Sequence, residues 1–247
     1  MGLQLPLVAA AVGVITVSTF AQGPAPAPAP LTAVTRTLYS KNTELFAEWR
    51  PLIVGEATRL TAHLTRTGER FIPYTEAKVT LTLTIGNATA TATADGPERL
   101  GVFRLNVTPT KAGPGRIVID IVAPTVPEHF VIEDVPVYAT VQEAIAKQPP
   151  AETGLVSYAK ERSWEGDFAT APVKVFFPGA GQVFTVPSTA LVRDGVTLHV
   201  YLQRTPERFE FRAVTTGRTI GDAVEIKNGL GANDRVVVRG ADKMPRP

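Results

Sequence analysis

The stretch from Val186 to Ala241 decides the fold of the chain. It opens with Val-Pro-Ser-Thr-Ala-Leu-Val-Arg-Asp-Gly (186–195) and closes with Asp-Arg-Val-Val-Val-Arg-Gly-Ala (234–241). Apolar and polar residues alternate from Val196 to Gln203. This period of two is typical of a half-buried strand, and Asp-Gly is a strong signal for a two-residue hairpin turn. The stretch therefore predicts a small all-β module, and none of its motifs indicates catalysis.

Composition excludes several classes of function. The chain has 247 residues, 44% of them hydrophobic, which is enough for one large domain or two small ones. A formal net charge of +2 gives no electrostatic footprint for nucleic acid. The sequence contains no cysteine, which excludes disulfides and thiolate sites and favours a bacterial envelope protein. Walker, His-Glu-x-x-His and Gly-x-Ser-x-Gly motifs are absent, so we expect no enzyme activity and no cofactor.

The N-terminus predicts export. Leu3 to Phe20 is apolar and is followed by a small residue, so residues 1–22 are interpreted as a signal peptide. No Lys or Arg precedes this segment, and about 18 apolar residues can just span a bilayer, so an uncleaved membrane anchor is the alternative. Residues 23–35, rich in Pro and Ala, are expected to form an extended linker.

Residues 36–140 read as short strands separated by turn signals. The clearest strand is Lys78 to Ile85, in which apolar residues and threonines alternate. Ile117 to Val122 is apolar on both faces, which predicts a central strand covered on both sides. Seven or so strands in about a hundred residues indicate an N-terminal immunoglobulin-like β-sandwich, without the Cys-Trp-Cys pattern of true immunoglobulin domains.

A connecting segment, residues 141–185, follows the sandwich. Val141 to Lys147 predicts a short helix, and Pro149-Pro150 marks the domain boundary. Trp164 and Phe168 are four residues apart, as in a helical turn that packs on a neighbour. The C-terminal module, residues 186–247, completes an all-β chain: a sandwich plus a small β-barrel-like domain.

Four segments of the C-terminal module carry a resemblance to a known family. They are Val-Pro-Ser-Thr-Ala-Leu-Val-Arg-Asp-Gly (186–195), Pro-Glu-Arg-Phe-Glu (206–210), Arg-Ala-Val-Thr-Thr-Gly (212–217) and Asn-Gly-Leu-Gly-Ala-Asn-Asp-Arg-Val-Val (228–237). The module resembles the membrane-proximal domain of the periplasmic adaptor subunits, or membrane fusion proteins, of RND-type heavy-metal efflux pumps. The sandwich resembles the extra N-terminal domain of some of these adaptors, through Pro-Leu-Ile-Val-Gly-Glu (51–56), Thr-Ala-His-Leu-Thr (61–65) and Pro-Tyr-Thr-Glu-Ala-Lys-Val-Thr (73–80). Trp-Glu-Gly-Asp-Phe-Ala-Thr-Ala-Pro (164–172) resembles the family's segment that leads into its core.

The chain departs from the family in its middle. In such adaptors a lipoyl-like domain, a long α-helical hairpin and a β-barrel lie between the two regions of resemblance. Here only Val173 to Thr185 occupies that place, and no heptad repeat exists to form the hairpin. The resemblance therefore implies a shortened, non-catalytic periplasmic adaptor or accessory protein. Its partner would be an inner-membrane RND pump, with self-association as a second option and no nucleic acid.

Arginines and aromatic residues cluster in the C-terminal module. Arg204, Arg208, Phe209, Phe211 and Arg212 lie along a predicted hairpin and are the candidate partner-binding residues. Aromatic and Arg anchors dominate the binding energy of many interfaces. The alternative is that these arginines are solvated strand edges that resist aggregation.

Two of the three histidines are candidate metal ligands, His63 and His129. His63 is expected on the polar face of its strand, whereas His129 lies among carboxylates that could bind Zn²⁺ weakly. A surface or packing role is the alternative for both, because a metal site needs three or four convergent ligands. Two other functions follow from these readings: a periplasmic metal-binding chaperone, or a carbohydrate- or surface-binding sandwich.

Overall fold

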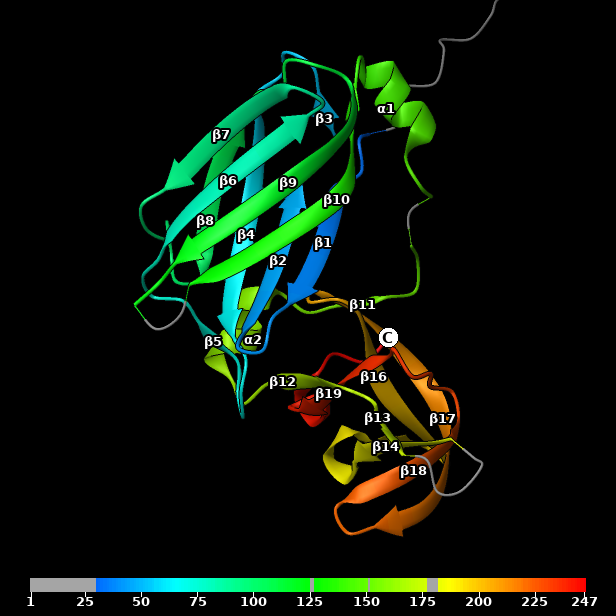
Figure 1. Ribbon diagram of the computed structural model, residues 1–247. Coiled ribbons are helices and arrows are strands. Elements are labelled where there is room, and N and C mark those ends of the chain that lie inside the picture. Colours follow the sequence, from blue (N-terminus) through cyan, green and yellow to red (C-terminus); the bar gives the residue numbers. More distant parts are fainter. Residues whose placement is uncertain (1–29, 125–126, 151, 177–181) are drawn as a thin grey trace, which may run out of the picture. The chain divides into compact units, whose positions relative to one another are not determined.

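The computed structural model describes residues 30–124, 127–150, 152–176 and 182–247 (Figure 1). The expected signal peptide or anchor, residues 1–22, lies outside the described residues, as does most of the linker. Residues 31–247 form one compact unit. Among the described residues, no helix is both long and apolar enough to cross a membrane.

The N-terminal part is a sandwich of two five-stranded sheets, seen face to face in Figure 1. In the first sheet, β2 lies between β1 and β4, and β4 also pairs with β5 and β8. The strands of this sheet are β1 (Val34–Tyr39), β2 (Thr43–Trp49), β4 (Thr58–Arg66), β5 (Ile72–Pro73) and β8 (Val102–Val107). The second sheet has the order β3-β10-β9-β6-β7. Its strands are β3 (Leu52–Ile53), β6 (Lys78–Ile85), β7 (Ala88–Ala94), β9 (Gly113–Val122) and β10 (Glu128–Tyr138).

The sandwich core follows from the alternation in the sequence. In β6, Val79, Leu81, Leu83 and Ile85 are at most 3% exposed and join one cluster with apolar side chains of the first sheet. Burying each such side chain contributes about 1.5–3 kcal/mol. The strand prediction from the sequence is confirmed here, with the same bounds.

The prediction that Ile117 to Val122 is covered on both faces is wrong. This segment belongs to β9, which lies between β10 and β6 in the middle of its sheet. Ile117, Ile119 and Ile121 are buried, but Val118 is half-buried and Val122 is 64% exposed. Each sheet of a sandwich packs with one face only, so the apolar residues on the other face of β9 remain accessible to solvent.

The connecting segment begins with helix α1 (Val141–Lys147), which has the predicted bounds. The Thr140 hydroxyl accepts a hydrogen bond from the Glu143 backbone N–H at 3.2 Å, and the Glu143 carboxylate accepts one from the Ala139 N–H at 3.0 Å. The first bond satisfies an N–H group that the first turn of a helix leaves unpaired, and the second ties Glu143 to the residue before the N-cap. After β11 (Val156–Ser157), helix α2 (Lys160–Glu165) contains Trp164 but ends before Phe168.

The C-terminal module is one curved nine-stranded sheet, to which β11 also contributes. Its main path is β12-β19-β16-β17-β18-β14-β13, with β11 on β17 and β15 on β16. The long strand β17 pairs with β16 along its first half and with β18 along its second half. The strands are β12 (Ala169–Pro172), β13 (Lys174–Phe176), β14 (Val183–Pro187), β15 (Val192–Asp194), β16 (Thr197–Thr205), β17 (Arg208–Ile220), β18 (Ala223–Asn228) and β19 (Arg235–Arg239). The predicted all-β class is confirmed.

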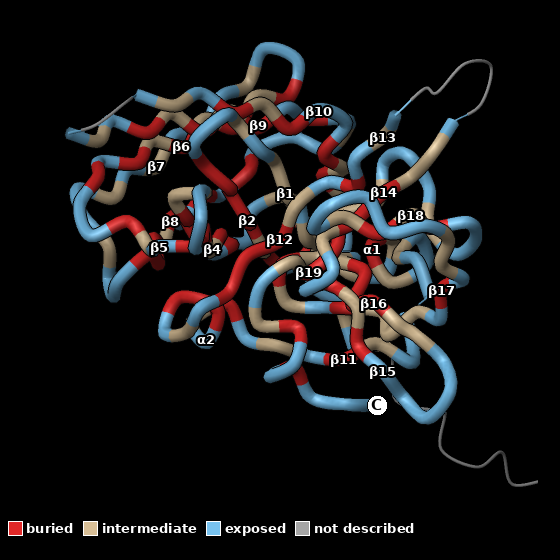
Figure 2. Tube along the Cα trace, turned by 90° about the horizontal axis from the view of Figure 1, so that it is seen from below, coloured by how far each residue is buried: buried red, intermediate tan, exposed pale blue. Residues whose placement is uncertain are grey.

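Strand β16 is buried on both faces in its central part (Figure 2). Val200 and Leu202 lie in the core of the C-terminal module. Tyr201, on the other face, is 0% exposed and packs in a second cluster with Trp164 and Phe168. The second cluster also contains Phe71 and Val102 of the sandwich part, so the two halves of the unit share buried apolar surface.

Candidate functional site

The predicted partner-binding residues lie on the β16–β17 hairpin, but their side chains differ in accessibility. Phe209 is 0% exposed and meets the Phe168 ring edge-on at 6.0 Å, so it is a core residue and cannot be a surface anchor. Phe211 is half-buried; its ring stacks on His199 with 4.3 Å between centroids and an angle of 6°. Phe209 and Phe211 are two residues apart, so they lie on the same face of β17. Phe209 lies inside the cluster that contains Trp164 and Phe168, whereas Phe211 packs against that cluster from its edge.

Arg212 and Arg204 are tied to a carboxylate of their own hairpin. Glu210 accepts two hydrogen bonds from the Arg212 guanidinium, at 2.8 and 2.7 Å, and its Oε2 lies 2.9 Å from Arg204 Nη2. The hydrogen bonds from Arg212 lower the pKa of Glu210, and Glu210 in turn raises the pKa of Arg212. Asp234 also lies 3.5 Å from Arg212. This end of the module is therefore closer to charge balance than its arginine content indicates.

Arg208, like Arg204, is an exposed cation of the hairpin. Its guanidinium donates to the Ser157 hydroxyl of β11. Within the described part of the chain, no carboxylate is recorded within ion-pair distance of Arg208. Its charge is thus less neutralised than that of Arg204 or Arg212, and it is the arginine best able to meet an acidic partner.

A buried ion pair lies where α2 meets the sandwich. The Lys160 ammonium contacts the Glu44 carboxylate, and the two side chains are 1% and 0% exposed. Glu44 also accepts a hydrogen bond from the Tyr39 hydroxyl at 2.7 Å, and the ammonium lies 4.8 Å from the centre of the Phe71 ring. Burial lowers the pKa of Lys160, and the charge of Glu44 opposes that shift. Two charges tolerate such burial only when each is paired.

The position of His63 corrects the expectation from the sequence. The face of β4 that carries His63 was predicted to be polar, and Arg59 on that face is indeed exposed. His63 itself is 3% exposed, because Trp164 covers it with 6.2 Å between the ring centroids. The Trp164 indole N–H donates to the Thr65 hydroxyl at 2.9 Å and fixes the covering ring. A segment distant in the sequence therefore buries this end of the strand.

His129 lies on the other sheet, in β10, and is exposed. Its Nδ1 is 2.7 Å from Asp120 Oδ1 of β9. The neighbouring carboxylates have other partners: Glu128 accepts from the Thr43 hydroxyl at 2.7 Å, and Glu133 from Arg116 at 2.9 Å. No group of three or more His, Cys, Asp or Glu side chains among the described residues is arranged to hold a metal ion. The structure does not bring His63 and His129 together, and their role as ligands stays a prediction.

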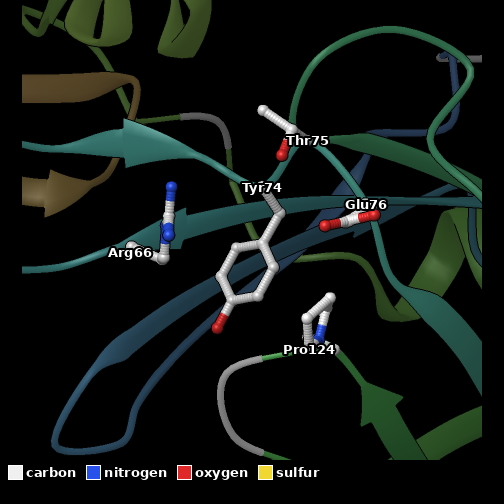
Figure 3. A pocket seen from close by; sticks show the side chains of 6 residues that line it. Arg66, Tyr74, Thr75, Glu76 and Pro124 are labelled. Atoms are coloured by element: carbon white, nitrogen blue, oxygen red, sulfur yellow. The ribbon is translucent and has the colours of Figure 1, made fainter.

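Two hollows lie among the described residues of the sandwich, and their linings mix polar, charged and apolar side chains. Figure 3 shows the first, where the Tyr74 ring lies between the Arg66 and Pro124 side chains. Its volume is about 40 Å³, enough for a water molecule or two, and the Tyr74 hydroxyl is 2.6 Å from that of Thr43. The second hollow, of about 410 Å³, is lined by both basic and acidic groups. Its lining is Leu31, Arg50, Pro51, Ile53, Glu56, Ala57, Thr58, Arg59 and Asn106.

Several residues of the junction escaped sequence reasoning. Arg235 of β19 lies over the Tyr39 ring of β1, 4.1 Å from its centre, and the Gln203 amide donates to the Tyr39 hydroxyl at 2.7 Å. Glu44 and Lys160 belong to the same contact region. In each of these contacts the two residues are more than a hundred positions apart in the sequence, so no local sequence pattern indicates that they meet.

The β14–β19 part of the chain matches a known domain family. Residues 182–243 match the sequence model of a family described as "RND MFPs, C-terminal permuted SH3 domain". This part of the chain is therefore similar to the C-terminal permuted SH3 domain of RND membrane fusion proteins. The match runs from the start of β14 to the short 3₁₀ helix η2 (Ala241–Lys243), so it takes in Arg204, Arg208 and Arg212. The resemblance seen in the sequence is confirmed for this domain.

Two solved structures are similar to parts of the chain. The first is the NMR structure of the N-terminal metal-binding site and membrane-proximal domain of SilB from Cupriavidus metallidurans CH34. The two sequences are 35% identical over a match that covers 29% of this chain and 39% of that chain, and the TM-score is 0.27. The second is the crystal structure of ZneB from Cupriavidus metallidurans. The two sequences are 16% identical over a match that covers 74% of this chain and 40% of that chain, and the TM-score is 0.23. At these TM-scores neither likeness identifies a shared overall fold. The chain spans about two-fifths of each. No curated protein matches the chain.

Proposed function

We propose that this chain is a non-catalytic periplasmic accessory of an RND-type efflux system for heavy metals. The proposal rests on the family match, in which residues 182–243 match the sequence model of the C-terminal permuted SH3 domain of RND membrane fusion proteins. In this proposal the C-terminal module docks on the inner-membrane pump. The sandwich, held to it through the shared apolar cluster and the Glu44–Lys160 pair, presents a second binding face.

The docking surface of the proposal is the exposed end of the β16–β17 hairpin. Arg208 supplies an exposed cation on one face of β17. The half-buried Phe211 supplies aromatic surface on the other face, where its ring stacks on His199 and lies 5.9 Å from the Arg246 guanidinium. Arg204 and Arg212 keep their positions through Glu210 and shape the rim of this surface. Arginine and aromatic side chains are typical interface anchors.

The mechanism of the proposal is scaffolding. Strands β13 and β14 pair directly, with Lys174 opposite Thr185 and Phe176 opposite Val183. The family's middle domains would have to lie between these strands, and only residues 177–182 do so here. The chain would therefore hold the pump or a further adaptor in place without itself forming a conduit.

A pull-down tests the docking role. The full chain carries a C-terminal tag, native membranes are solubilised in mild detergent, and co-purifying proteins are identified. We expect an RND pump to be recovered with the native chain and to be lost with Arg208→Glu. Arg116→Glu, which reverses another exposed strand arginine on the sandwich, is the matched control and should retain the pump. Equal recovery with both variants would contradict docking through Arg208, and no recovery at all would contradict the accessory role.

A metal-binding chaperone is the second candidate, favoured by the exposed His129–Asp120 pair at 2.7 Å. Calorimetric titration with Zn²⁺ separates the two histidines. If His129 is a ligand, His129→Ala removes the binding heat, whereas His63→Ala leaves it unchanged. If no saturable heat is found for the native chain, this candidate is excluded. The carbohydrate-binding alternative has little support, because Trp49 and Trp164 are 4% and 7% exposed and form no surface platform.

A further inference from the structure

Strand β7 (Ala88–Ala94) is an open edge of the second sandwich sheet. It pairs with β6 along its whole length, from Val79↔Ala94 to Ile85↔Ala88, without a register shift, and β6 is its one neighbour in that sheet. Its sequence is Ala-Thr-Ala-Thr-Ala-Thr-Ala. The alanines are half-buried toward the core and the three threonines are exposed. An edge strand presents a row of unpaired backbone groups to which another strand can bind.

The hairpin turn shows which backbone groups are open. β6 and β7 are joined by two residues, Gly86-Asn87, and Gly86 has φ +59°, as in a type II′ turn. The pair that flanks such a turn, Ile85 and Ala88, is hydrogen-bonded, and bonded pairs then alternate along an antiparallel ladder. The alanines of β7 therefore bond to β6. Thr89, Thr91 and Thr93 direct their N–H and C=O groups away from the sheet.

Other long edges carry features that discourage strand pairing, and β7 does not. Among described edge strands of five or more residues, β1 contains Arg36 and β8 contains Arg104. β1 is also partly covered, since Arg235 and Gln203 contact Tyr39. Charged residues, prolines and bulges are the usual protection of an edge. β7 has none of the three, although it is seven residues long.

We propose that β7 pairs antiparallel with β7 of a second copy of this chain, with the two-fold axis at Thr91. The strand reads the same in both directions, so this pairing sets Thr91 opposite Thr91 and Thr89 opposite Thr93. These are the residues with open backbone groups, so N–H and C=O groups meet along the new ladder. The two sheets become one continuous sheet, and the exposed threonines of both copies share one face.

Charge at the ends of β7 fits the same arrangement. Beyond the strand, Asn87 of one copy lies opposite Asp95 of the other. The Lys111 ammonium is at this turn, 3.2 Å from where a Cβ on Gly86 would lie. Asp95 is exposed and pairs with Lys78 at 2.9 Å in its own chain. Each end of the joint ladder thus brings the Lys111 ammonium of one copy toward the Asp95–Lys78 ion pair of the other, in which the aspartate is the group next to the new ladder.

Cross-linking tests the register directly, because the chain has no cysteine of its own. On the two-fold axis, Thr91→Cys places two thiols in a pair with about 5.5 Å between Cα atoms, within the range of a disulfide. We expect mild oxidation of this variant of the full chain to give a covalent dimer. Thr82→Cys is the matched control: Thr82 is opposite Thr91 in β6, and about 14 Å separates it from its symmetry mate. Failure of Thr91→Cys to cross-link, or equal cross-linking of both variants, overturns the proposal.

A charge swap separates loss of pairing from loss of folding. In Thr91→Lys two like charges face each other, and we expect the dimer dissociation constant from sedimentation to rise at least about tenfold. Thr91→Glu should act in the same way. An equimolar mixture of the two variants should form a heterodimer as tight as the native homodimer, which misfolded variants cannot do. A native chain that stays monomeric, or a mixture that stays dissociated, contradicts the pairing. Neither test depends on the pump.

Discussion

The Glu44–Lys160 pair places two ionisable groups in a site with almost no solvent. Each charge is compensated by the other, by the Tyr39 hydroxyl and by the electrons of the Phe71 ring. The pair also joins β2 of the sandwich to α2, so its contribution to stability lies at the junction of two parts of the chain. Removal of one partner leaves an uncompensated charge in low dielectric, which costs more than the pair itself contributes.

We therefore expect Lys160→Met to reduce the free energy of unfolding by about 3–5 kcal/mol. The Glu44 carboxylate then remains buried with one hydrogen bond from Tyr39 and no cation. Urea denaturation followed by far-UV circular dichroism measures the change. The double variant Glu44→Gln, Lys160→Met should recover part of the loss, because it removes the unpaired charge. A single variant as stable as the native chain would show that the pair contributes nothing.

Individual residues were the hardest to place from the sequence. Alternation predicted the buried face of β6 correctly, because those side chains pack within one domain. It assigned His63 to a polar face, and it left Phe209 among surface candidates. Both are buried by α2 and Phe168, which arrive from a separate part of the chain. Local periodicity carries no information about a later segment that packs on the outside of a strand.

At the scale of elements, the turn before β8 depends on the absence of a side chain. Gly101 has φ +74°, and a Cβ there would lie 2.5 Å from the Trp164 ring and 2.8 Å from Pro73. The Gly101 N–H also donates to the Tyr74 carbonyl at 2.8 Å. This turn, β5 and α2 therefore fit together only because residue 101 is glycine.

Gly101→Ala should destabilise the chain by the cost of its left-handed backbone plus an overpacking cost of about 1–3 kcal/mol. Gly55→Ala is a matched control. Gly55 has nearly the same φ, +79°, but no atom lies within 4 Å of the position of its Cβ. It should show the backbone cost alone, about 1 kcal/mol. Thermal unfolding of both variants measures the difference, and equal shifts in Tm would contradict the contact with Trp164.

Elements with a local cause were predicted well. α1 has the predicted bounds because Thr140, Glu143 and the following prolines define its two ends. A bulged strand is harder to predict, as β10 shows: Val131 is half-buried, whereas Val135 and Val137 are buried. The register of β10 shifts between Ile132 and Val135, where Asp134 has φ +54°. That bulge moves the buried face from even to odd positions, an effect that a strict period of two cannot represent.

For the whole molecule, the shared cluster around Trp164 makes residues 31–247 a single unit, and we expect one unfolding transition in calorimetry. Trp164→Ala removes the hydrogen bond to Thr65 and the ring over His63. It should separate the transition into two, one for the sandwich and one for the permuted SH3 domain. Trp49→Ala is the control: Trp49 is equally buried but lies in the sandwich core. It should lower Tm by a similar loss of about 3–5 kcal/mol while keeping one transition. Two transitions in the native chain would contradict the coupling.

The pairing of β13 with β14 determines how easily a domain can be inserted into, or deleted from, this chain during evolution. The chain leaves the nine-stranded sheet at Phe176 and re-enters it at Val183, which lies directly opposite Phe176. The exit and entry points are one strand spacing apart, about 4.8 Å. Any insert whose own termini lie close together can occupy this place, and the closure entropy depends only weakly on its length. A single in-frame recombination at this hairpin could therefore add or delete entire domains while both flanking modules stay folded, and a fluorescent reporter spliced there would exploit the same geometry.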